Sequence, residues 1–283
     1  MRINWNGHLL RALPAAWAQA QRAMYYGDAL FETIRVFEGR IPLLNRHWER
    51  LHKGLRQLGF EIPVNWNSVF WEEHIQRIAP SNARVRLTVW RSPGGYFQPS
   101  DNRPQFLITA QALPDAVLGW PQTSLLVGVS NSVRLPVDVY SNLKTLNSAR
   151  YVMAAIEARQ HGWDDALVLN AFDRVCEATA SNVFWWKRDV LHTVPLSEGC
   201  VAGIMRAFVQ EVAMRNGCMV REEALCPEEL FEADEIFLTN AIRGIQPVRI
   251  FAGAGLRTEC TRWLFDHLKV RLTVLISGEA AEL

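Results

Sequence analysis

The segment SNLKTLNSAR, residues 141–150, lies where a strand-rich region gives way to a helix. Ser141 and Asn142 are polar, turn-forming residues before Lys144, and a helix is expected to start near Ser148. A lysine at such a junction can point into a cleft, where burial lowers the pKa of its amine and makes it a nucleophile toward carbonyl compounds. A single lysine is more often a solvated surface charge, so a functional role for Lys144 needs support from other segments of the sequence.

The region before this segment predicts a mixture of strands and one clear helix. A hairpin is expected in FETIRVFEGRIPLL, residues 31–44, with its turn at Glu38-Gly39. Leucines and Trp48 recur at spacings of three and four in RHWERLHKGLRQLGF, residues 46–60, which predicts a helix that Gly59 ends. Alternation predicts strands in RVRLTVWR, residues 84–91, and in QFLITAQAL, residues 105–113.

The region after residue 120 predicts more strands, interleaved with three helices. The expected strands are SLLVGVS (124–130), ALVLN (166–170), NVFWWK (182–187), VLHTV (190–194) and EIFLTN (235–240). The expected helices cover 148–162, 204–217 and the surroundings of 260–272. Strands and helices do not alternate regularly, which favours an α+β or mixed-sheet fold over a doubly wound one. Prolines and a glycine in LPDAVLGWP, residues 113–121, predict a linker, so we expect domains at 1–117 and 118–283.

Composition excludes several classes of protein. The chain has 283 residues, 49% of them hydrophobic, and a formal net charge of +1, which predicts neither a nucleic-acid-binding nor an anionic-membrane surface. Five widely spaced cysteines form no CxxC pair, so we expect neither a disulfide framework nor a metal site. No signal peptide or membrane-spanning stretch is apparent, and we expect a cytoplasmic protein. Dinucleotide, P-loop, zincin and hydrolase fingerprints are absent.

Four further features could take part in chemistry, although each also has an ordinary structural explanation. Glu177 precedes the small residues of ATAS, so its carboxylate could approach a flat ring and keep a pyridine nitrogen protonated. Gly199 and Gly203 frame a turn into a helix, whose first N–H groups at Ile204 and Met205 could bind phosphate. Thr239-Asn240-Ala241 ends a strand with small, polar residues, and Arg50 could form a bidentate contact with phosphate.

The order and spacing of these segments resemble the class IV aminotransferases, the fold-type IV enzymes that use pyridoxal 5'-phosphate (PLP). The resemblance runs through YYGDALFETIRV, HWERL, LKTLN, EATASNVF, GIMR and ADEIFLTNAIRGIQPV. It implies a smaller N-terminal α/β domain and a larger C-terminal domain with a mixed, barrel-like sheet and helices. It also implies that Lys144 bonds to PLP and moves the proton, that Glu177 pairs with the ring nitrogen, and that the phosphate is held by Arg50, Ile204, Met205, Asn240 and Ala241. Many relatives carry hydroxyls at Met205 and at Asn240-Ala241, where this chain must use backbone groups and Asn240.

The resemblance leaves the substrate open among three groups of enzymes. LKTLN is similar to D-amino-acid aminotransferases and to 4-amino-4-deoxychorismate lyases more than to branched-chain aminotransferases. D-amino-acid enzymes usually carry a tyrosine where this chain has Phe31, and an Arg-x-His pair where it has RSPGGYFQPS. The double glycine of that loop and the GIMR turn are more similar to the lyases, whereas Arg35 favours the branched-chain enzymes.

A substrate carboxylate still requires a cation. We expect Arg91 first, because it falls in phase with the apolar face at the end of a strand, then Arg243 and then Arg35, which is also a candidate for an interdomain contact. We hypothesise an aminotransferase that moves an amino group between an amino acid, with D-amino acids favoured, and a 2-oxo acid such as 2-oxoglutarate. The alternatives are a lyase that eliminates pyruvate and a branched-chain L-amino-acid aminotransferase. The resemblance implies a homodimer.

Overall fold

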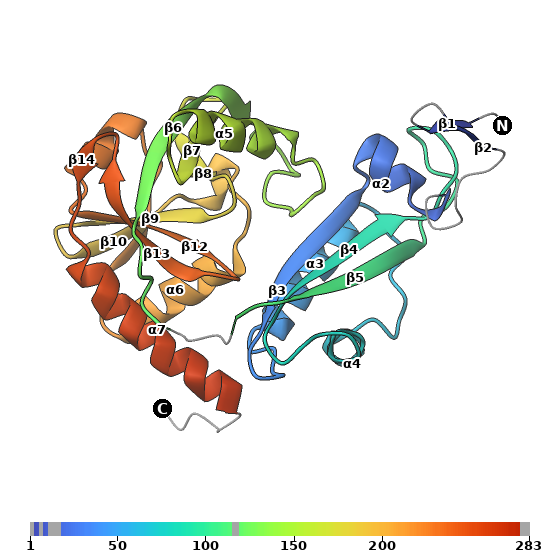
Figure 1. Cartoon of the computed structure of the whole chain (residues 1–283), viewed down its shortest axis with the longest axis horizontal. Coiled ribbons are helices and arrows are strands. Elements are labelled where there is room, and N and C mark those ends of the chain that lie inside the picture. The colour runs from blue at the N-terminus through green and yellow to red at the C-terminus, as the bar shows by residue number, and fades with distance from the viewer. Residues whose placement is uncertain (1–2, 6–7, 11–17, 115–118, 278–283) are drawn as a thin grey trace.

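The computed structural model describes residues 3–5, 8–10, 18–114 and 119–277, and it separates into two units, each built on its own sheet (Figure 1). The smaller unit contains a three-stranded antiparallel sheet in the order β3-β4-β5, and the larger unit contains a nine-stranded mixed sheet. The α+β fold predicted from the sequence is therefore confirmed. The expected boundary at 117/118 lies outside the described residues. A separate short hairpin pairs β1 (Ile3–Trp5) with β2 (His8–Leu10).

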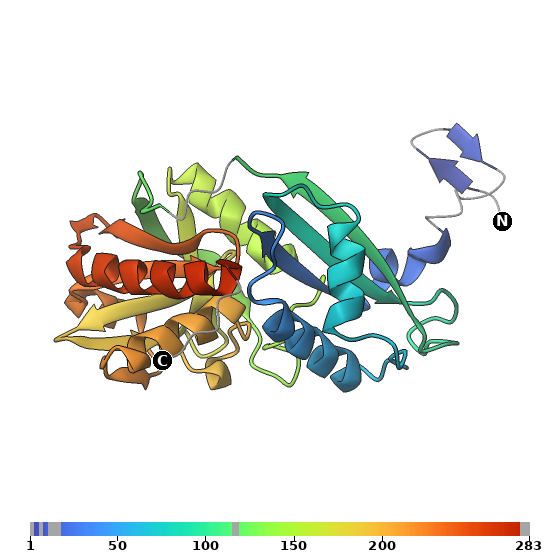
Figure 2. The same ribbon diagram turned by 90° about the horizontal axis from the view of Figure 1, so that it is seen from below.

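Alternation along the strands of the small sheet divides its two faces. On β3 (Ala29–Val36) and β4 (Ala83–Arg91) every second side chain is buried, and the buried set packs under the helices α3 and α4. The helix α3 contributes Leu51 and Leu55, and α4 contributes Trp71 and Ile75. Figure 2 shows both helices on the same side of this sheet, which leaves the other face toward the large unit. The remaining elements are α2 (Gln21–Tyr26), α3 (Leu44–Gln57), α4 (Ser68–Gln76) and β5 (Pro104–Ala112).

The large unit curls its sheet around a buried core. Its strands run in the order β11-β10-β9-β12-β13-β6-β7-β8, with β14 added beside β13, and parallel and antiparallel pairs are mixed. The helices α6 and α7 pack on one face, where Phe208 of α6 joins Phe184 of β9 and Phe237 of β12 in one buried cluster. The strands are β6 (Leu125–Leu135), β7 (Asp165–Asn170), β8 (Val175–Ala178), β9 (Asn182–Lys187), β10 (Val190–Thr193), β11 (Val220–Glu222), β12 (Glu235–Asn240), β13 (Gly244–Phe251) and β14 (Ala254–Gly255). The helices are α5 (Ala149–Gln160), α6 (Ile204–Arg215) and α7 (Glu259–Ser277), with short 3-10 turns at Leu196–Glu198 and Pro227–Glu232.

The hairpin expected at residues 31–44 is wrong in its second half. Glu38 and Gly39 do form the turn, both with positive φ, but only Phe37 and Arg40 pair across it. The chain then enters α3 at Leu44, and β3 pairs with β4 instead. The apolar run after the turn supplies the buried start of a helix, which periodicity over so few residues cannot distinguish from a strand. Within the part of the chain that the structure describes, no helix meets the length and hydropathy needed to cross a bilayer.

Candidate active site

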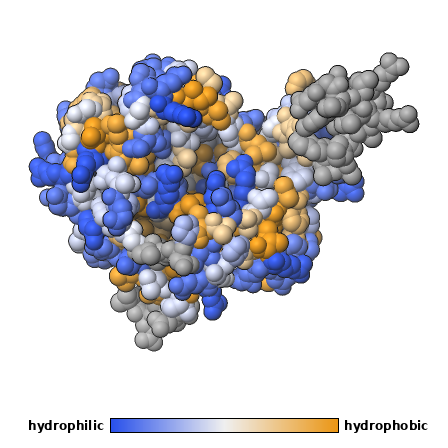
Figure 3. All heavy atoms as spheres, in the orientation of Figure 1, coloured by the Kyte–Doolittle hydropathy of each residue, from blue (hydrophilic) through white to orange (hydrophobic). Residues whose placement is uncertain are grey.

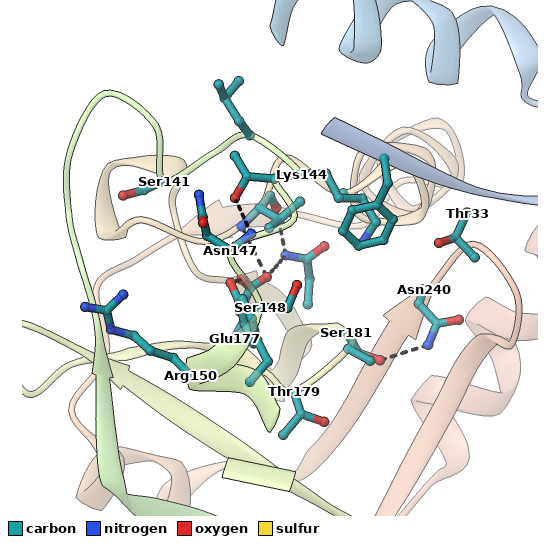
Figure 4. A pocket seen from close by; sticks show the side chains of 18 of the residues that line it. Thr33, Ser141, Lys144, Asn147, Ser148, Arg150, Glu177, Thr179, Ser181 and Asn240 are labelled. Carbon is teal, nitrogen blue, oxygen red and sulfur yellow. Dashed lines mark hydrogen bonds between the residues drawn. The ribbon is translucent and has the colours of Figure 1, made fainter. Parts of the chain in front are cut away.

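A cavity of about 1090 Å³ lies between the two units and is lined by residues from both (Figure 4). In the face that Figure 3 shows, polar and apolar side chains are mixed and the surface is hollowed between the two units. Of the residues expected from the sequence, the cavity brings together Lys144, Arg50, Glu177, Ile204, Met205, Asn240, Ala241, Phe31 and Arg243. It leaves out Arg91 and Arg35.

Lys144 is held by main-chain pairing to the small sheet. Its carbonyl accepts the Phe31 N–H at 2.9 Å, and the Leu146 N–H donates to the Ala29 carbonyl at 3.1 Å. The segment before α5, which belongs to the large unit, therefore pairs antiparallel along the edge of β3 in the small unit. The Lys144 Nζ lies 4.5 Å from the centroid of the Phe31 ring. Burial lowers the pKa of the Lys144 amine, as does the charge of Arg50, whereas Glu32 and Glu177 oppose the shift.

Glu177 lies on β8 with only 4% of its surface exposed, and three donors reach its carboxylate. The Tyr151 hydroxyl donates to Oε1 at 2.6 Å, while the Asn182 amide and the Val201 N–H donate to Oε2 at 3.2 and 3.1 Å. Burial nevertheless raises the pKa of Glu177 to about 7, against the Tyr151 hydrogen bond and the Lys144 charge, which lower it. A buried carboxyl group that titrates near neutrality can form a hydrogen bond with a pyridine nitrogen.

Arg50, on α3, belongs to a buried ionic cluster with Glu32 and His47. Its Nε donates to Glu32 Oε1 at 2.8 Å, its Nη1 donates to the Ala202 carbonyl at 2.9 Å, and His47 Nδ1 lies 2.7 Å from Glu32 Oε2. Burial alone would raise the pKa of Glu32, but Arg50 and His47 outweigh it and hold that pKa at about 2. The Ala202 contact places the guanidinium beside the turn that leads into α6.

The first turn of α6 opens toward the cavity at Ile204 and Met205. Gly203 is its N-cap and provides no side-chain cap, so the first N–H groups of the helix are available to an anion. A Cβ at Gly203 would stand 1.9 Å from Asn182 Oδ1. The glycine is therefore required by the close approach of the Asn182 amide, which also donates to Glu177.

Asn240 and Ala241 end β12 on the other side of the same hollow. Asn240 Oδ1 accepts the N–H groups of Ile242 and Arg243 at 3.0 and 2.9 Å and so shapes the turn into β13. Its Nδ2 donates to the Ser181 hydroxyl at 3.0 Å (Figure 4). An amide nitrogen carries two hydrogens, so one remains to donate to a ligand.

Phe31, Arg86 and Arg243 line the part of the cavity beyond Lys144. The Arg86 guanidinium lies 3.9 Å from the Phe31 centroid. Burial lowers the pKa of Arg86, and the neighbouring Arg84 lowers it further. Arg243 is exposed and contacts Gln246 at 3.1 Å. Among the described residues, neither Arg86 nor Arg243 forms an ion pair within 4 Å. The charge of Arg243 does act on the Asp165 carboxylate, which lines the same cavity, so Arg86 is the more available to an anionic substrate.

Arg91 and Arg35 have other surroundings. Arg91 shares the buried phase of β4 with Leu87 and Val89, and that phase faces α3 rather than the cavity. Its guanidinium binds Asp28 at 2.9 Å and the Leu58 carbonyl at 2.6 Å, so the cost of burying it is met internally. Arg35 points from β3 to the Ile242 carbonyl at 3.4 Å, which makes it a contact between the units.

Sequence reasoning missed Glu32, His47, Arg86, Tyr151 and Asn182. Two of these residues have a clear signal in the sequence and one has a weak signal. Glu32 is a carboxylate on the apolar phase of β3, and Arg86 lies one strand position out of phase with the valines of β4. His47 precedes Arg50 by one helical turn, which is a weak signal. Nothing in the sequence marks Tyr151 or Asn182, because their role is to donate hydrogen bonds to Glu177, and only the fold brings them near it.

Together these residues fit a flat, phosphorylated aldehyde such as PLP. Lys144 offers an amine with a lowered pKa, and Glu177 offers a buried carboxylate in the same cavity. The open start of α6, with the glycine that the approach of Asn182 requires, offers N–H donors to a phosphate. Arg50 adds a cation next to that turn.

Known proteins that resemble the chain carry three different functional names. It is 31% identical to a putative branched-chain-amino-acid aminotransferase from Methanocaldococcus jannaschii, over 88% of this chain and 87% of that protein. It is 29% identical to the aminodeoxychorismate lyase of Vibrio harveyi, over 80% and 84% of the two chains. It is 25% identical to the D-alanine aminotransferase of Bacillus licheniformis, over 100% and 99%.

Solved structures share the fold over almost the whole chain. A branched-chain aminotransferase from Thermoproteus uzoniensis, crystallised with norvaline, superposes with a TM-score of 0.82 at 24% identity and covers 99% of this chain and 96% of its own. The 4-amino-4-deoxychorismate lyase of Pseudomonas aeruginosa superposes with a TM-score of 0.79 at 28% identity, over 95% and 98%. The family model of class IV amino-transferases matches residues 29–251. The chain therefore belongs to the class IV aminotransferases, a family of PLP-dependent enzymes.

Proposed function

We propose that this enzyme transfers an amino group between an amino acid and a 2-oxo acid such as 2-oxoglutarate, with D-amino acids as the favoured donors. The placement of Arg86 carries the transfer part of this proposal. Arg86 and Lys144 line the same cavity, on either edge of β3, and each lies close to the Phe31 ring, with Arg86 Cζ 3.9 Å and Lys144 Nζ 4.5 Å from its centroid. The charge of Arg86 also contributes to lowering the pKa of Lys144. An arginine that forms no ion pair among the described residues and lines the same cavity as a reactive amine suits a substrate that carries a carboxylate.

The site residues divide the remaining tasks. PLP, when bound, supplies a conjugated ring that accepts the electron pair of the broken Cα–H bond. We propose that Lys144 Nζ removes the proton from Cα as a general base, for which its lowered pKa is suited. Glu177 holds the ring nitrogen, and Arg50, the first turn of α6 and the Asn240-Ala241 turn hold the phosphate. Arg86, with Arg243 farther out, orients the carboxylate.

The preference for D-amino acids rests on the LKTLN segment at 143–147, together with arginines that can replace the missing Arg-x-His pair. The test is incubation of the PLP-loaded enzyme with D-alanine, D-glutamate, L-leucine or L-glutamate, each without a 2-oxo acid. We expect the D-amino acids to shift the absorbance of the bound cofactor and to yield the matching 2-oxo acid. A shift with L-leucine but not with either D-amino acid would contradict this choice and favour a branched-chain enzyme.

A lyase is the second candidate. It is favoured by the glycine-rich loop at 91–100, which lacks the Arg-x-His pair, and by the presence of aminodeoxychorismate lyases among the similar proteins. A lyase would release pyruvate from 4-amino-4-deoxychorismate without any 2-oxo acid acceptor. An aminotransferase would not turn over that substrate repeatedly under the same conditions.

We further propose that the enzyme works as a homodimer. Apolar side chains gather near one end of the cavity, where Tyr25, Tyr96 and Phe97 are 62%, 85% and 89% exposed and Phe97 lines the cavity itself. Tyr26 joins them through its contact with Phe97, whose ring centroid lies 5.5 Å away. Exposed aromatic residues grouped in this way are typical of protein interfaces.

A further inference from the structure

Tyr151 lies on the first turn of α5 and reaches Glu177 from a different element. Its hydroxyl is 2.6 Å from Glu177 Oε1, and its ring packs partly buried against the core of the large unit. It also lines the cavity. Burial raises the pKa of Tyr151 well above its usual range, and the charge of Glu177 raises it further. The hydroxyl therefore keeps its hydrogen and acts as a donor throughout the neutral pH range.

The two oxygens of Glu177 are held unequally. Oε2 accepts both the Asn182 amide and the Val201 N–H, at 3.2 and 3.1 Å. Oε1 accepts Tyr151 alone among the described residues, in the shortest of the three bonds. A hydrogen bond from a neutral donor to a carboxylate is among the stronger kinds in proteins, and it stabilises only the ionised form.

We propose that Tyr151 is a positioning residue: its hydroxyl favours the ionised form of the Glu177 carboxylate and fixes the rotation at which that carboxylate meets the cofactor ring. Burial alone favours the neutral acid, which could not stabilise a protonated ring nitrogen. The Tyr151 hydroxyl offsets part of that penalty from the side of Oε1. This inference rests on the assignment of Glu177 to the ring nitrogen, and it is independent of which amino acid is the donor.

The first test compares Tyr151→Phe with the wild type in the full-length chain freed of cofactor. Infrared titration of the buried carboxyl, identified by its absence in Glu177→Gln, should show the pKa of Glu177 moving upward in Tyr151→Phe. The dissociation constant of PLP, followed by fluorescence, should rise about tenfold, as expected for the loss of one hydrogen bond to a charged group. Thr273→Val is the control, because it removes an exposed hydroxyl on α7 that lies outside the cavity, and it should behave as the wild type.

A double-mutant cycle separates this role from simple packing. If Tyr151 acts through the Glu177 charge, Tyr151→Phe should have little further effect on PLP affinity in a Glu177→Gln background. Equal weakening in both backgrounds, or an unchanged titration of Glu177 in Tyr151→Phe, would overturn the proposal. If Glu177→Gln alone binds PLP like the wild type, the assignment of Glu177 fails instead, and the inference fails with it.

Discussion

Arg86 and Arg91 lie five residues apart on β4, and because side chains alternate along a strand, they face opposite sides of the sheet. The alternation that buries Val85, Leu87 and Val89 also buries Arg91, where Asp28 neutralises it, and directs Arg86 into the cavity. From sequence we expected Arg91 to bind the substrate, because an arginine in an apolar phase appeared to need an anion. The required anion is instead Asp28, a residue whose position only the tertiary structure reveals.

For Arg86 we predict a specific kinetic effect. Arg86→Gln should raise the KM for 2-oxoglutarate by at least about tenfold, because it removes one charge-assisted contact with a carboxylate. Steady-state kinetics of the transamination would measure it. Arg77→Gln, at the exposed C-terminal end of α4, is the control and should leave KM unchanged. An unchanged KM in Arg86→Gln would assign the carboxylate to another cation, with Arg243 next.

Glu177 should make the stability of the cofactor-free protein depend on pH. Its pKa is raised from 4.5 to about 7 in the fold, so its contribution to stability is complete below about pH 4.5 and is lost as pH rises through 7. Glu177→Gln has no carboxylate at this position, so this loss should be absent. Between pH 5 and pH 8 the unfolding free energy of the variant should therefore decrease by on the order of 1–3 kcal/mol less than that of the wild type. Denaturant titrations at both pH values measure the difference. Parallel curves for the two proteins would contradict the raised pKa.

At the scale of elements, the start of α6 depends on one close approach. Gly203→Ala would place a methyl group against the Asn182 amide, which donates to Glu177 and to the Val201 carbonyl. We predict a loss of about 1–3 kcal/mol of stability and weaker PLP binding, since the amide must move. Thermal unfolding and cofactor titration would measure both. Gly255→Ala, which meets open space on β14, is the control. Equal behaviour of the two variants would contradict the packing argument.

Periodicity identified most of the main elements, and it failed where it had few residues to work with. The helix at α3 and the strands β4, β5, β9 and β12 follow clear patterns. Periodicity wrongly predicts a strand for the short run IPLL at residues 41–44, and it does not predict the helices α2 and α4. The residues of the candidate site also fall into those that the sequence predicts and those that it does not. Residues in motifs, such as Lys144 and Glu177, could be predicted, whereas Tyr151 and Asn182 act through contacts between distant segments.

At the scale of the whole molecule, the apolar surface near the cavity predicts self-association. A variant with Tyr25, Tyr96 and Phe97 all changed to serine should sediment as a monomer, while the wild type sediments as a dimer, because the interface would lose its aromatic contacts. Phe231→Ser, which alters an exposed phenylalanine outside the cavity, is the control and should remain dimeric. Sedimentation velocity measures all three. A monomeric wild type would contradict the proposal.

Lys144 is the residue through which the enzyme would bind PLP, and the pairing of its segment with β3 places it between the two units. The most direct test is reduction of the PLP-loaded enzyme with borohydride, followed by digestion and mass spectrometry of the peptides. We predict a phosphopyridoxyl group on the peptide that contains Lys144, and no such group in Lys144→Ala. The same group on Lys53, Lys187 or Lys269, or on no lysine at all, would contradict the assignment of Lys144.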